Sequence, residues 1–471
     1  GHSVNNINIS ENVFPKLYKD LENIEFDDDF VRISTMMDYG NKARNTFGDH
    51  SILALGAIVE ILQKRKDDSS TSEPTPINKT IHVIKSLKHP SEVERLRETY
   101  GEGFFLIGVH SEEKSRIRHL TKNGKMKDGQ AKELLGRDFK ENEKYGQHTS
   151  ETFHLSDLFV YLDDSDNRSR LESSITRFVH ILLSDPNRTP DFDEYAMYMA
   201  FSSSLRSADT SRQVGAVIGL KGDIVAAGAN DCPCPNGGIY CTHHNEEKGE
   251  YYIEVPFGRD RELGHETDEN IRGYDSNTKI KNEILDKLFK SIIQDYNGSE
   301  IELKKILSSS EINNITEYGR SVHAEMEALL SCARNGVSCV GKTLYTTTFP
   351  CHNCAKHIIS SGINRVVYIE PYEKSKAIDL HKDAIVLGRK TDTEKVVFEQ
   401  FIGVGPRRFF DLFSMTHGMG RKLKRKDKDG NVLKWTPKNK SLRFGLTPAS
   451  YLEQETVASK IYEILRDKVK K

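Results

Sequence analysis

His323 and Glu325 precede a Pro-Cys-x-x-Cys stretch that contains Cys351 and Cys354. A zinc ion held for catalysis usually takes three protein ligands and leaves its fourth position for water, whereas a structural zinc uses all four. His323, Cys351 and Cys354 supply three ligands, and the short cysteine spacing lets one helix N-terminus present both thiolates. Glu325 is placed to take a proton from water and pass it to a leaving amine. The pattern therefore predicts hydrolysis at a zinc centre.

A structural zinc ribbon is the alternative interpretation of these residues, with Glu325 an ordinary residue on a helix surface. A ribbon would use a second Cys-x-x-Cys pair, and the sequence contains none. His-x-Glu followed by Pro-Cys-x-x-Cys is instead a known signature of zinc deaminases that act on nucleobases. We therefore favour deaminase chemistry over a structural clip.

The bulk composition limits the classes of protein to consider. A length of 471 residues predicts two domains. The net charge is −2, so no global field recruits nucleic acid or a membrane. Seven cysteines, an odd number, lie between Cys232 and Cys354, which is not the distribution of a secreted disulfide framework. We expect a cytoplasmic protein, and no apolar run approaches the ~18 residues needed to span a bilayer.

The elements of the first half follow a strand-helix-strand rhythm. Short apolar runs at 80–84 and 104–109 predict buried strands with a helix between them. A further strand, DLFVYLDD, is followed by the helical pattern SRLESSITRFVHILL. This order predicts a parallel α/β domain over 1–185, which ends where two prolines break the helical pattern near Pro186.

The second half, 186–471, begins with a helix and a strand hairpin, QVGAVIGLKGDIVAAGAN. A polar, largely helical insertion at about 257–320 separates this hairpin from His323. A helix and the strand RVVYIE follow the cysteine pair, so we expect an α/β/α domain. The C-terminal extension is basic. Its stretch GRKLKRKDKDGNVLKW predicts an exposed hairpin rather than a nucleic-acid patch, because Asp residues interrupt the basic run.

Three segments carry a resemblance to a known family: RSADTSRQVGAVIGLKGDIVAAGAND, HAEMEAL and TTFPCHNCAKHIISSGINRVVYIE. Together they resemble the deoxycytidylate deaminases, over roughly residues 190–380. The resemblance implies a cytidine-deaminase-like fold, a zinc held by His323, Cys351 and Cys354, and proton transfer by Glu325.

The same resemblance implies that Asn230 contacts the nucleoside and that the backbone of Ala324 lies against the pyrimidine edge. A turn residue in the left-handed conformation is the alternative interpretation of Asn230. Phosphate contacts would fall to basic residues near the pocket, and Tyr372 is a candidate for stacking on the base. For these residues an exposed charge or core packing is the alternative. The basic candidates are Arg206, Arg212, Lys374 and Lys376.

A free nucleotide is a better candidate substrate than a polymer, because the chain offers no obvious basic and aromatic groove that would track a strand. The leading hypothesis is hydrolytic deamination of dCTP or dCMP to dUTP or dUMP with release of ammonia. A polynucleotide cytidine deaminase is the alternative enzyme. The alternative outside the enzymes is a regulatory protein that binds a nucleotide without turnover. Such a sensor would lack the proton-transfer Glu, whereas Glu325 is present in this sequence.

A second metal site is a further hypothesis. The stretch NDCPCPNGGIYCTHH brings Cys232, Cys234, Cys241 and His243 close together in sequence, and such a cluster can hold a structural zinc. The deaminase resemblance does not require these cysteines, so the site stays open at this stage. Cys332 and Cys339 are expected to be small core residues.

The segment IKSLKHPSEVERLRETYGEGFFLIGVHSEEKSRIRHL is similar to part of the nucleotide-kinase-like domains. A kinase-like domain ahead of a deoxycytidylate deaminase resembles the antiphage dCTP deaminases of bacteria. That resemblance implies depletion of the dCTP pool that a phage needs, a homo-oligomer, and in some members repression by a small RNA.

No Gly-x-x-x-x-Gly-Lys-Ser/Thr string occurs in the sequence, so we expect a regulatory or scaffold role for 1–185 rather than kinase activity. The Arg and Lys residues at 112–126 fit a solvated helix face better than a phosphate or RNA contact.

Overall fold

The structure is a computed structural model, and the chain divides into two compact units, Gly1–Pro190 with Ile402–Lys471 and Asp191–Phe401. The sequence prediction placed all of 186–471 in one domain. Residues 402–471 instead complete the first unit, so that part of the prediction is wrong. The described residues are 2–21, 25–26, 28–71, 73–139, 141, 145–162, 168–245, 249–253, 274–315, 317–372, 374–389, 394–436, 440–445 and 447–469.

The first unit contains two small sheets. β1 (Ser3–Asn8) pairs in parallel with β2 (Thr80–Lys85), and β3 (Ile107–His110) pairs in parallel with β4 (Leu158–Tyr161). A short strand from the end of the chain, β13 (Gly403–Val404), pairs antiparallel with β4. The helices of this unit are α1 (Phe14–Leu17), α2 (Asp29–Phe47), α3 (Ile52–Asp67), α4 (Pro90–Tyr100), α5 (Glu113–Lys122), α6 (Asp128–Phe139), α7 (Thr149–Phe153), α8 (Ser169–Leu182), α15 (Pro406–Phe413) and α16 (Pro448–Val469).

β2, α4, β3, β4 and α8 appear in the predicted order, and β3 and β4 pair in parallel. β2 pairs instead with β1, a strand that the sequence analysis did not predict, so β2 and β3 lie in separate sheets. The predicted strand at 104–109 begins later, at Ile107. The likeness of this unit to nucleotide kinases stays a prediction.

The C-terminal segment joins the first unit through buried contacts. Helix α16 packs on α3, where Ala458 and Tyr462 enter the same core as the apolar face of α3. The Arg65 Nε atom lies 2.9 Å from the Glu455 Oε2 atom, and both side chains are buried. Trp435 donates its indole N–H to the carbonyl of Leu183 at 3.0 Å. Because these partners are far apart in the chain, local sequence patterns could not place this segment.

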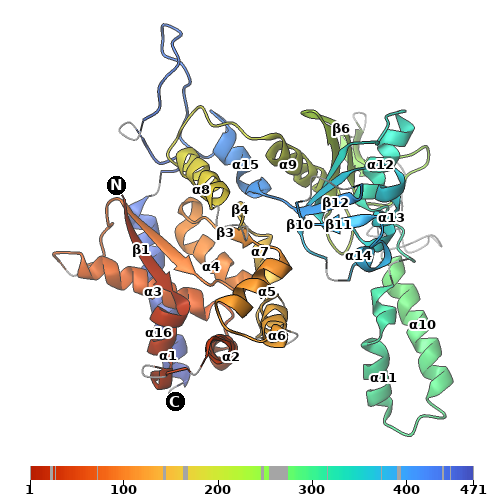
Figure 1. Cartoon of the computed structure of the whole chain (residues 1–471), viewed down its shortest axis with the longest axis horizontal. Coiled ribbons are helices and arrows are strands. Elements are labelled where there is room, and N and C mark those ends of the chain that lie inside the picture. The colour runs from red at the N-terminus through yellow and green to blue at the C-terminus, as the bar shows by residue number, and fades with distance from the viewer. Residues whose placement is uncertain are drawn as a thin grey trace. The chain divides into compact units, whose positions relative to one another are not determined.

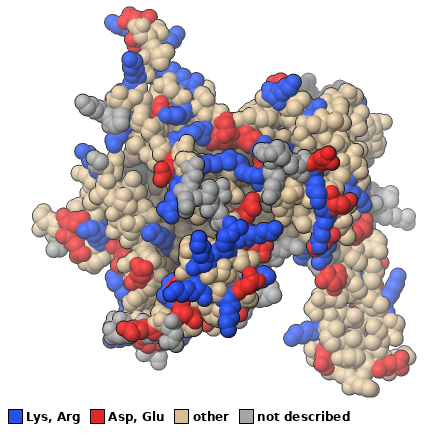
Figure 2. All heavy atoms as spheres, in the orientation of Figure 1, with Lys and Arg blue, Asp and Glu red and all other residues tan. Residues whose placement is uncertain are grey.

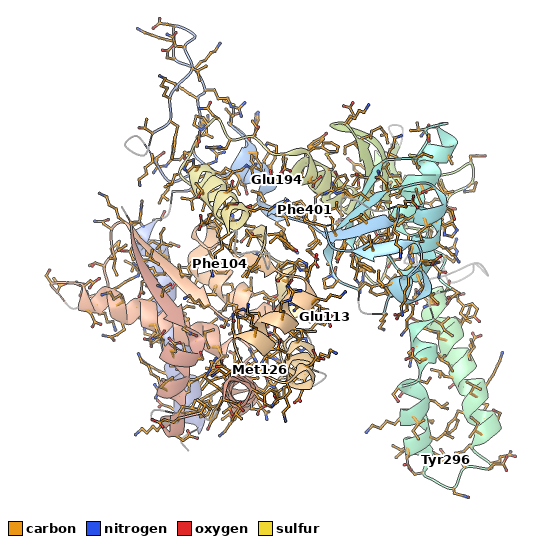
Figure 3. The ribbon with its side chains drawn as sticks, in the orientation of Figure 1. Phe104, Glu113, Met126, Glu194, Tyr296 and Phe401 are labelled. Carbon is orange, nitrogen blue, oxygen red and sulfur yellow. The ribbon has the colours of Figure 1, made fainter. Side chains whose placement is uncertain are left out.

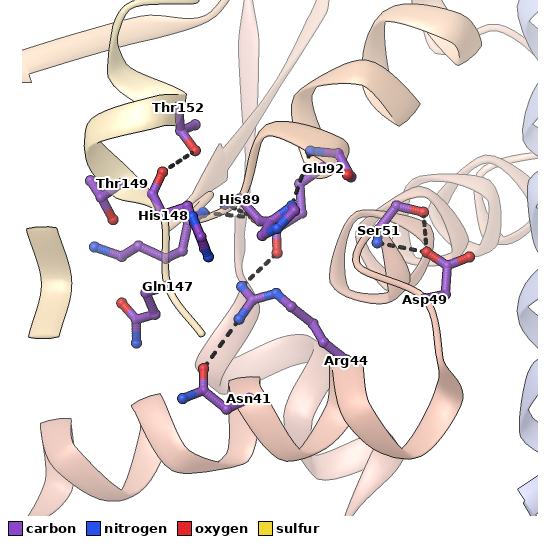
Figure 4. Close-up of polar contacts among 12 residues, drawn as sticks. Asn41, Arg44, Asp49, Ser51, His89, Glu92, Gln147, His148, Thr149 and Thr152 are labelled. Carbon is purple, nitrogen blue, oxygen red and sulfur yellow. Dashed lines mark hydrogen bonds and ion pairs between the residues drawn. The ribbon is translucent and has the colours of Figure 1, made fainter. Parts of the chain in front are cut away.

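A buried ion pair organises the interior of the first unit (Figure 4). The Arg44 Nη2 atom lies 2.8 Å from the Glu92 Oε1 atom, and both side chains are almost fully buried. The other oxygen of Glu92 accepts the backbone N–H groups of Lys88 and His89, which fixes the start of α4. Removal of one partner of such a pair typically costs about 3–5 kcal/mol, because it leaves a buried charge unpaired.

The second unit is built on one mixed sheet whose strands follow the order β11-β12-β10-β9-β5-β6. β5 is antiparallel to both β6 and β9, whereas β9, β10, β12 and β11 are parallel to one another. The strands are β5 (Gly215–Leu220), β6 (Asp223–Ala229), β9 (Thr343–Thr348), β10 (Arg365–Glu370), β11 (Ile385–Leu387) and β12 (Val396–Gln400). The helices are α9 (Phe192–Ser204), α12 (Ala324–Arg334), α13 (His352–Ser360) and α14 (Ala377–Leu380).

Helices cover the two faces of this sheet, as the α/β/α prediction expected (Figure 1). Two glycines on neighbouring strands set how closely the helices approach. A Cβ atom at Gly215 would lie 1.9 Å from the carbonyl oxygen of Ala200 in α9. A Cβ atom at Gly228 would lie 2.3 Å from the carbonyl oxygen of Ala324 in α12. Since Gly215 pairs with Ala229 and Ala216 pairs with Gly228, the two glycines face opposite sides of the sheet.

The predicted insertion at 257–320 lies partly outside the described residues. Its described part is helical, as expected, and forms a hairpin of α10 (Ser276–Ile292) and α11 (Glu300–Ser308). Tyr296 lies at the tip of this hairpin, which extends away from the sheet of the second unit (Figures 1 and 3). A separate two-stranded sheet, β7 (Thr242–Asn245) with β8 (Glu250–Ile253), precedes the insertion.

Among the helices that the structure describes, none combines the length and the apolar character required to cross a bilayer.

The first unit should lose stability in mild acid. Burial lowers the pKa of His82 to about 4, of His89 to about 3 and of His110 to about 4. Because these values lie below the pKa of 6.5 in the unfolded chain, the stabilisation is complete above pH 6.5 and is lost as the pH falls toward 4. We expect the urea midpoint, followed by the fluorescence of Trp435, to fall steadily between pH 7 and pH 5.

The variant His89→Asn is the control for this prediction. Asn keeps a side-chain acceptor at the N-terminus of α4 but does not titrate. Its urea midpoint should depend less steeply on pH than that of the wild type. An equal slope in the two proteins would show that His89 is not one of the groups responsible.

Candidate active site

His323, Cys351 and Cys354 come together in the second unit. The His323 Nδ1 atom lies 3.4 Å from the Cys351 Sγ atom and 3.3 Å from the Cys354 Sγ atom. Zinc bond lengths of about 2.3 Å to sulfur and 2.0–2.1 Å to nitrogen in a tetrahedral site place these atoms about 3.5 Å apart. Within the described part of the chain, this is the one cluster of His, Cys and acidic residues whose ligand atoms are grouped for a metal. The donor set and its spacing fit zinc.

Two helix N-termini bring the three ligands to one point. His323 is the residue before α12, and Cys351 is the residue before α13. The Cys351 sulfur accepts the backbone N–H of Cys354 at 3.4 Å, as expected of an N-cap side chain. The partial positive charge at a helix N-terminus stabilises a thiolate.

A backbone bridge fixes the entry to α12. The N–H group of Val322 donates to the carbonyl of Asp231 at 2.9 Å, and the N–H group of Asp231 donates to the carbonyl of Val322 at 3.3 Å. Asp231 lies just beyond the end of β6. The edge strand of the sheet therefore sets the position of His323.

The electrostatics of the cluster favour metal binding at one thiol. The hydrogen bond with Cys354, with a further contribution from His323, lowers the pKa of Cys351 to about 4. The hydrogen bond with Cys351 raises the pKa of His323 to about 9, and the charges of Glu325 and Asp209 add to this effect. Because zinc binds neutral imidazole and thiolate, its binding must release the proton of His323.

Glu325 lies in the first turn of α12 and is only 4% exposed. Burial raises its pKa to about 7, while the charge of His323 opposes the shift and that of Cys351 adds to it. A carboxylate with a pKa near neutrality can both accept and return a proton at physiological pH. Glu325 therefore has the burial and the location that a proton-transfer group beside a metal needs.

The structure brings two of the predicted nucleotide-binding residues together. The guanidinium carbon of Arg212 lies 5.5 Å from the ring centroid of Tyr372, and its Nη1 atom lies 3.2 Å from the Glu370 Oε1 atom. The Tyr372 ring packs against the buried cluster that contains Cys351 and Cys354. Burial raises the pKa of Tyr372, and the charge of Cys351 adds to this effect. Arg212 and Tyr372 therefore line the surroundings of the cluster.

The other three basic candidates are not gathered in this way, and one of them, Lys376, is exposed. The Arg206 Nη2 atom lies 3.9 Å from the Cys241 Sγ atom, and Lys374 is exposed. No contact of Lys374 with the cluster residues is found among the described side chains.

Asn230 has a structural role that sequence reasoning missed. Its side-chain oxygen accepts the N–H group of Val214 at 2.6 Å, and its side-chain nitrogen donates to the carbonyl of Arg212 at 2.9 Å. The buried amide therefore holds the loop that leads into β5. Contact with a nucleoside stays a prediction for this residue.

Cys232, Cys234 and Cys241, which were predicted to hold a second zinc, are not grouped closely enough to bind one ion. Cys232 is buried, Cys234 is half-buried and donates to the carbonyl of Gly237 at 3.0 Å, and Cys241 is exposed. Their sulfur atoms do not all lie within 4.8 Å of one another. The side chain of His243 lies outside the described residues, so a second ion is not shown.

Sequence reasoning also missed three polar residues around the cluster: Asp209, Ser321 and Glu370. Asp209 and Ser321 stand beside residues that the motifs single out, yet each resembles an ordinary turn residue in sequence. Only their hydrogen bonds, which join separate segments, reveal a role.

The basic stretch at 112–126 falls on α5 and the turn after it. None of the residues of α5 is buried, which agrees with the solvated helix face predicted from the sequence. Lys and Arg side chains gather on the surface over α5 and α6 (Figure 2).

The family model and several curated relatives are deoxycytidylate deaminases. The family model for the cytidine and deoxycytidylate deaminase zinc-binding region matches residues 265–370. The deoxycytidylate deaminase of Enterobacteria phage T4 is 30% identical over 186 residues, which cover 38% of this chain and 78% of that protein. The probable deoxycytidylate deaminase of Drosophila melanogaster is 54% identical over 48 residues, which cover 10% of this chain and 23% of that protein.

A solved dCMP deaminase from the cyanophage S-TIM5 aligns with a TM-score of 0.24 and 18% identity, and the alignment covers 45% of this chain and 100% of that chain. The sheet, the paired helix N-termini and the His-Cys-Cys group together define a zinc-binding α/β unit of the deaminase class. The length and identity of the phage T4 match then assign the family. This chain belongs to the deoxycytidylate deaminase family.

The variant Gly228→Ala should displace α12 and weaken zinc binding. Its new Cβ atom would meet backbone atoms of Ala324 and Ala328 at 2.3 and 2.5 Å, so the helix itself must move. Overpacking of this kind typically costs about 1–3 kcal/mol. We expect a lower urea midpoint and faster loss of zinc to a chelator.

The matched control is Gly129→Ala in α6, where no atom lies within 4 Å of the added Cβ. This variant should be neutral or more stable by up to about 1 kcal/mol, because Ala is favoured over Gly inside a helix. Wild-type zinc retention in Gly228→Ala would contradict the close approach of α12 to β6.

Proposed function

We propose that this protein hydrolyses the exocyclic amine of a deoxycytidine nucleotide, dCMP or dCTP, to give the deoxyuridine nucleotide and ammonia. The observation that carries the proposal is the His323, Cys351 and Cys354 cluster, with the buried Glu325 two residues after His323 in the first turn of α12. The names of the relatives in phage T4 and Drosophila support the choice of a deoxycytidylate substrate.

The proposed residue roles follow from the geometry of the cluster. His323, Cys351 and Cys354 would hold zinc, which when bound supplies a Lewis acid that lowers the pKa of water. Glu325 would take a proton from the attacking water and deliver it to the ring nitrogen N3 as the C–O bond forms at C4. It would then pass the second water proton to the amine, so that the C–N bond breaks, ammonia leaves and the carbonyl forms. A pKa near 7 suits both transfers, because neither the acid nor the base form is strongly disfavoured.

Nucleotide recognition is proposed for residues around the same cluster. Arg212 would bind phosphate and Tyr372 would stack on the base, since the two side chains already contact each other beside Cys351. The backbone of Ala324, which lies between His323 and Glu325, would bind the pyrimidine edge. Asn230 would contact the sugar, and Arg206 and Lys374 are further basic candidates for a phosphate contact.

Ammonia release from purified protein tests the activity directly. We expect turnover of dCMP or dCTP, with little from CTP or a cytosine-containing oligonucleotide. Glu325→Ala should retain zinc but lose about 10²–10⁴-fold in kcat, the usual contribution of a general acid or base. Removal of zinc with a chelator should abolish turnover, and added zinc should restore it. Deamination of the oligonucleotide alone would favour a polynucleotide enzyme, and zinc-loaded protein without turnover would refute the proposal.

We also propose that dCTP is the physiological substrate and that its depletion limits phage replication. The resemblance to the antiphage dCTP deaminases supports this role. Bacteria that express the wild-type chain should show a lower ratio of dCTP to dUTP after infection, and fewer plaques, than bacteria that express Glu325→Ala. Equal nucleotide pools in the two strains would count against the role, even if the purified enzyme is active.

A further inference from the structure

The loop 205–214 connects α9 to β5 and carries Arg212. Its backbone is tied to the end of β6 by several hydrogen bonds. Ser207 donates its hydroxyl to the carbonyl of Asn230 at 2.6 Å, and the N–H group of Ala208 donates to Asp231 Oδ2 at 3.1 Å. These bonds attach the loop to the sheet.

Asp209 ties the same loop to the segment that carries His323. Its Oδ1 atom accepts the N–H groups of Ser211 at 2.8 Å and Arg212 at 3.4 Å. Its Oδ2 atom accepts the hydroxyl of Ser321 at 2.7 Å. A single carboxylate thus holds the backbone of Arg212 on one oxygen and the residue two positions before His323 on the other.

The far side of the loop reaches the segment that carries the cysteines. Arg212 pairs with Glu370, and Glu370 accepts the hydroxyl of Thr348 at 3.3 Å and, through its backbone carbonyl, the N–H group of Phe349 at 2.7 Å. Phe349 lies two residues before Cys351. The loop therefore spans both ligand-bearing segments, with Asp209 as its link to one of them.

We propose that Asp209 is a positioning residue, which holds the loop bearing Arg212 in register with the segment bearing His323. The inference rests on the proposed deaminase function, because it assigns to Arg212 a contact with substrate. Asp209 is neither one of the three grouped metal ligands nor one of the proposed substrate contacts. It acts by fixing the distance between the nucleotide-binding side chain and the zinc ligand.

The first test compares Asp209→Ala with Asp209→Asn. Asn can still accept the loop N–H groups and can donate to the hydroxyl of Ser321, so it preserves the link without the charge. We expect Asp209→Ala to raise the KM for dCMP by about 10–100-fold, the effect of hydrogen bonds to a charged group, with a smaller change in kcat. Asp209→Asn should recover most of the KM. Equal impairment in the two variants would overturn positioning by hydrogen bonds.

The second test is a double-mutant cycle with Ser321→Ala. If the Asp209 to Ser321 bond is the link, Ser321→Ala should raise KM in the wild type but add little in the Asp209→Ala background. Additive effects would contradict the proposal. Ser321→Ala and Asp209→Asn remove few atoms and should fold. If Asp209→Ala fails to fold, their KM values relative to the wild type still test the proposal. Ser291→Ala and Asp286→Asn on α10 are the matched controls, and both should behave as wild type.

A readout that does not need turnover separates this inference from the proposed function. In protein loaded with Co²⁺ in place of zinc, the visible absorption spectrum reports the geometry of the His and Cys ligands. We expect the spectrum to shift in Ser321→Ala and Asp209→Ala and to stay unchanged in Asp209→Asn. Wild-type protein that binds Co²⁺ but deaminates no nucleotide would refute the proposed function alone, whereas an unshifted spectrum in both shortened variants would refute the role of Asp209.

Discussion

The convergence of two helix N-termini, those of α12 and α13, is the constraint on which the site depends. His323 stands at one and Cys351 at the other, and the imidazole nitrogen reaches both sulfurs at 3.3–3.4 Å. Each helix contributes backbone N–H groups and the positive end of its dipole, which lower the cost of holding a thiolate away from water. The sheet supplies the alignment, because α12 rests on β6 at a glycine and β9 leads directly toward Cys351.

The same arrangement buries the carboxyl group of Glu325 in a place where its charged form is poorly solvated. Burial of Glu325 disfavours its ionised form and raises its pKa, and the negative charge of Cys351 adds to this effect. A buried carboxyl of this kind costs stability, and the apolar core under α12 and α13 offsets that cost. That core is formed by Ala216, Ile218, Ala328, Leu344, Ile358, Val366 and Phe398. Helix α12 therefore contributes residues both to the candidate active site and to the apolar core.

The second unit is inserted into the chain of the first. Residues on both sides of Asp191–Phe401 belong to one compact unit, joined through β13 on β4 and through α16 on α3. The ion pairs Arg44 with Glu92 and Arg65 with Glu455 are buried within that unit. Such pairs are costly to break, so the last seventy residues are part of the structural core of the first unit and not a loose tail.

The sequence by itself determined the ligand types, their spacing and part of the secondary structure, such as the β5–β6 hairpin, α13 and β10. Residue chemistry and local periodicity are properties of short stretches, so His323, Glu325, Cys351 and Cys354 could be selected without a structure. The tertiary structure decided which distant groups meet. It showed that Asn230 holds the loop before β5, that Asp209 reaches Ser321, and that 402–471 returns to the first unit. These outcomes depend on hydrogen bonds and packing between segments far apart in the chain, for which local periodicity carries no signal.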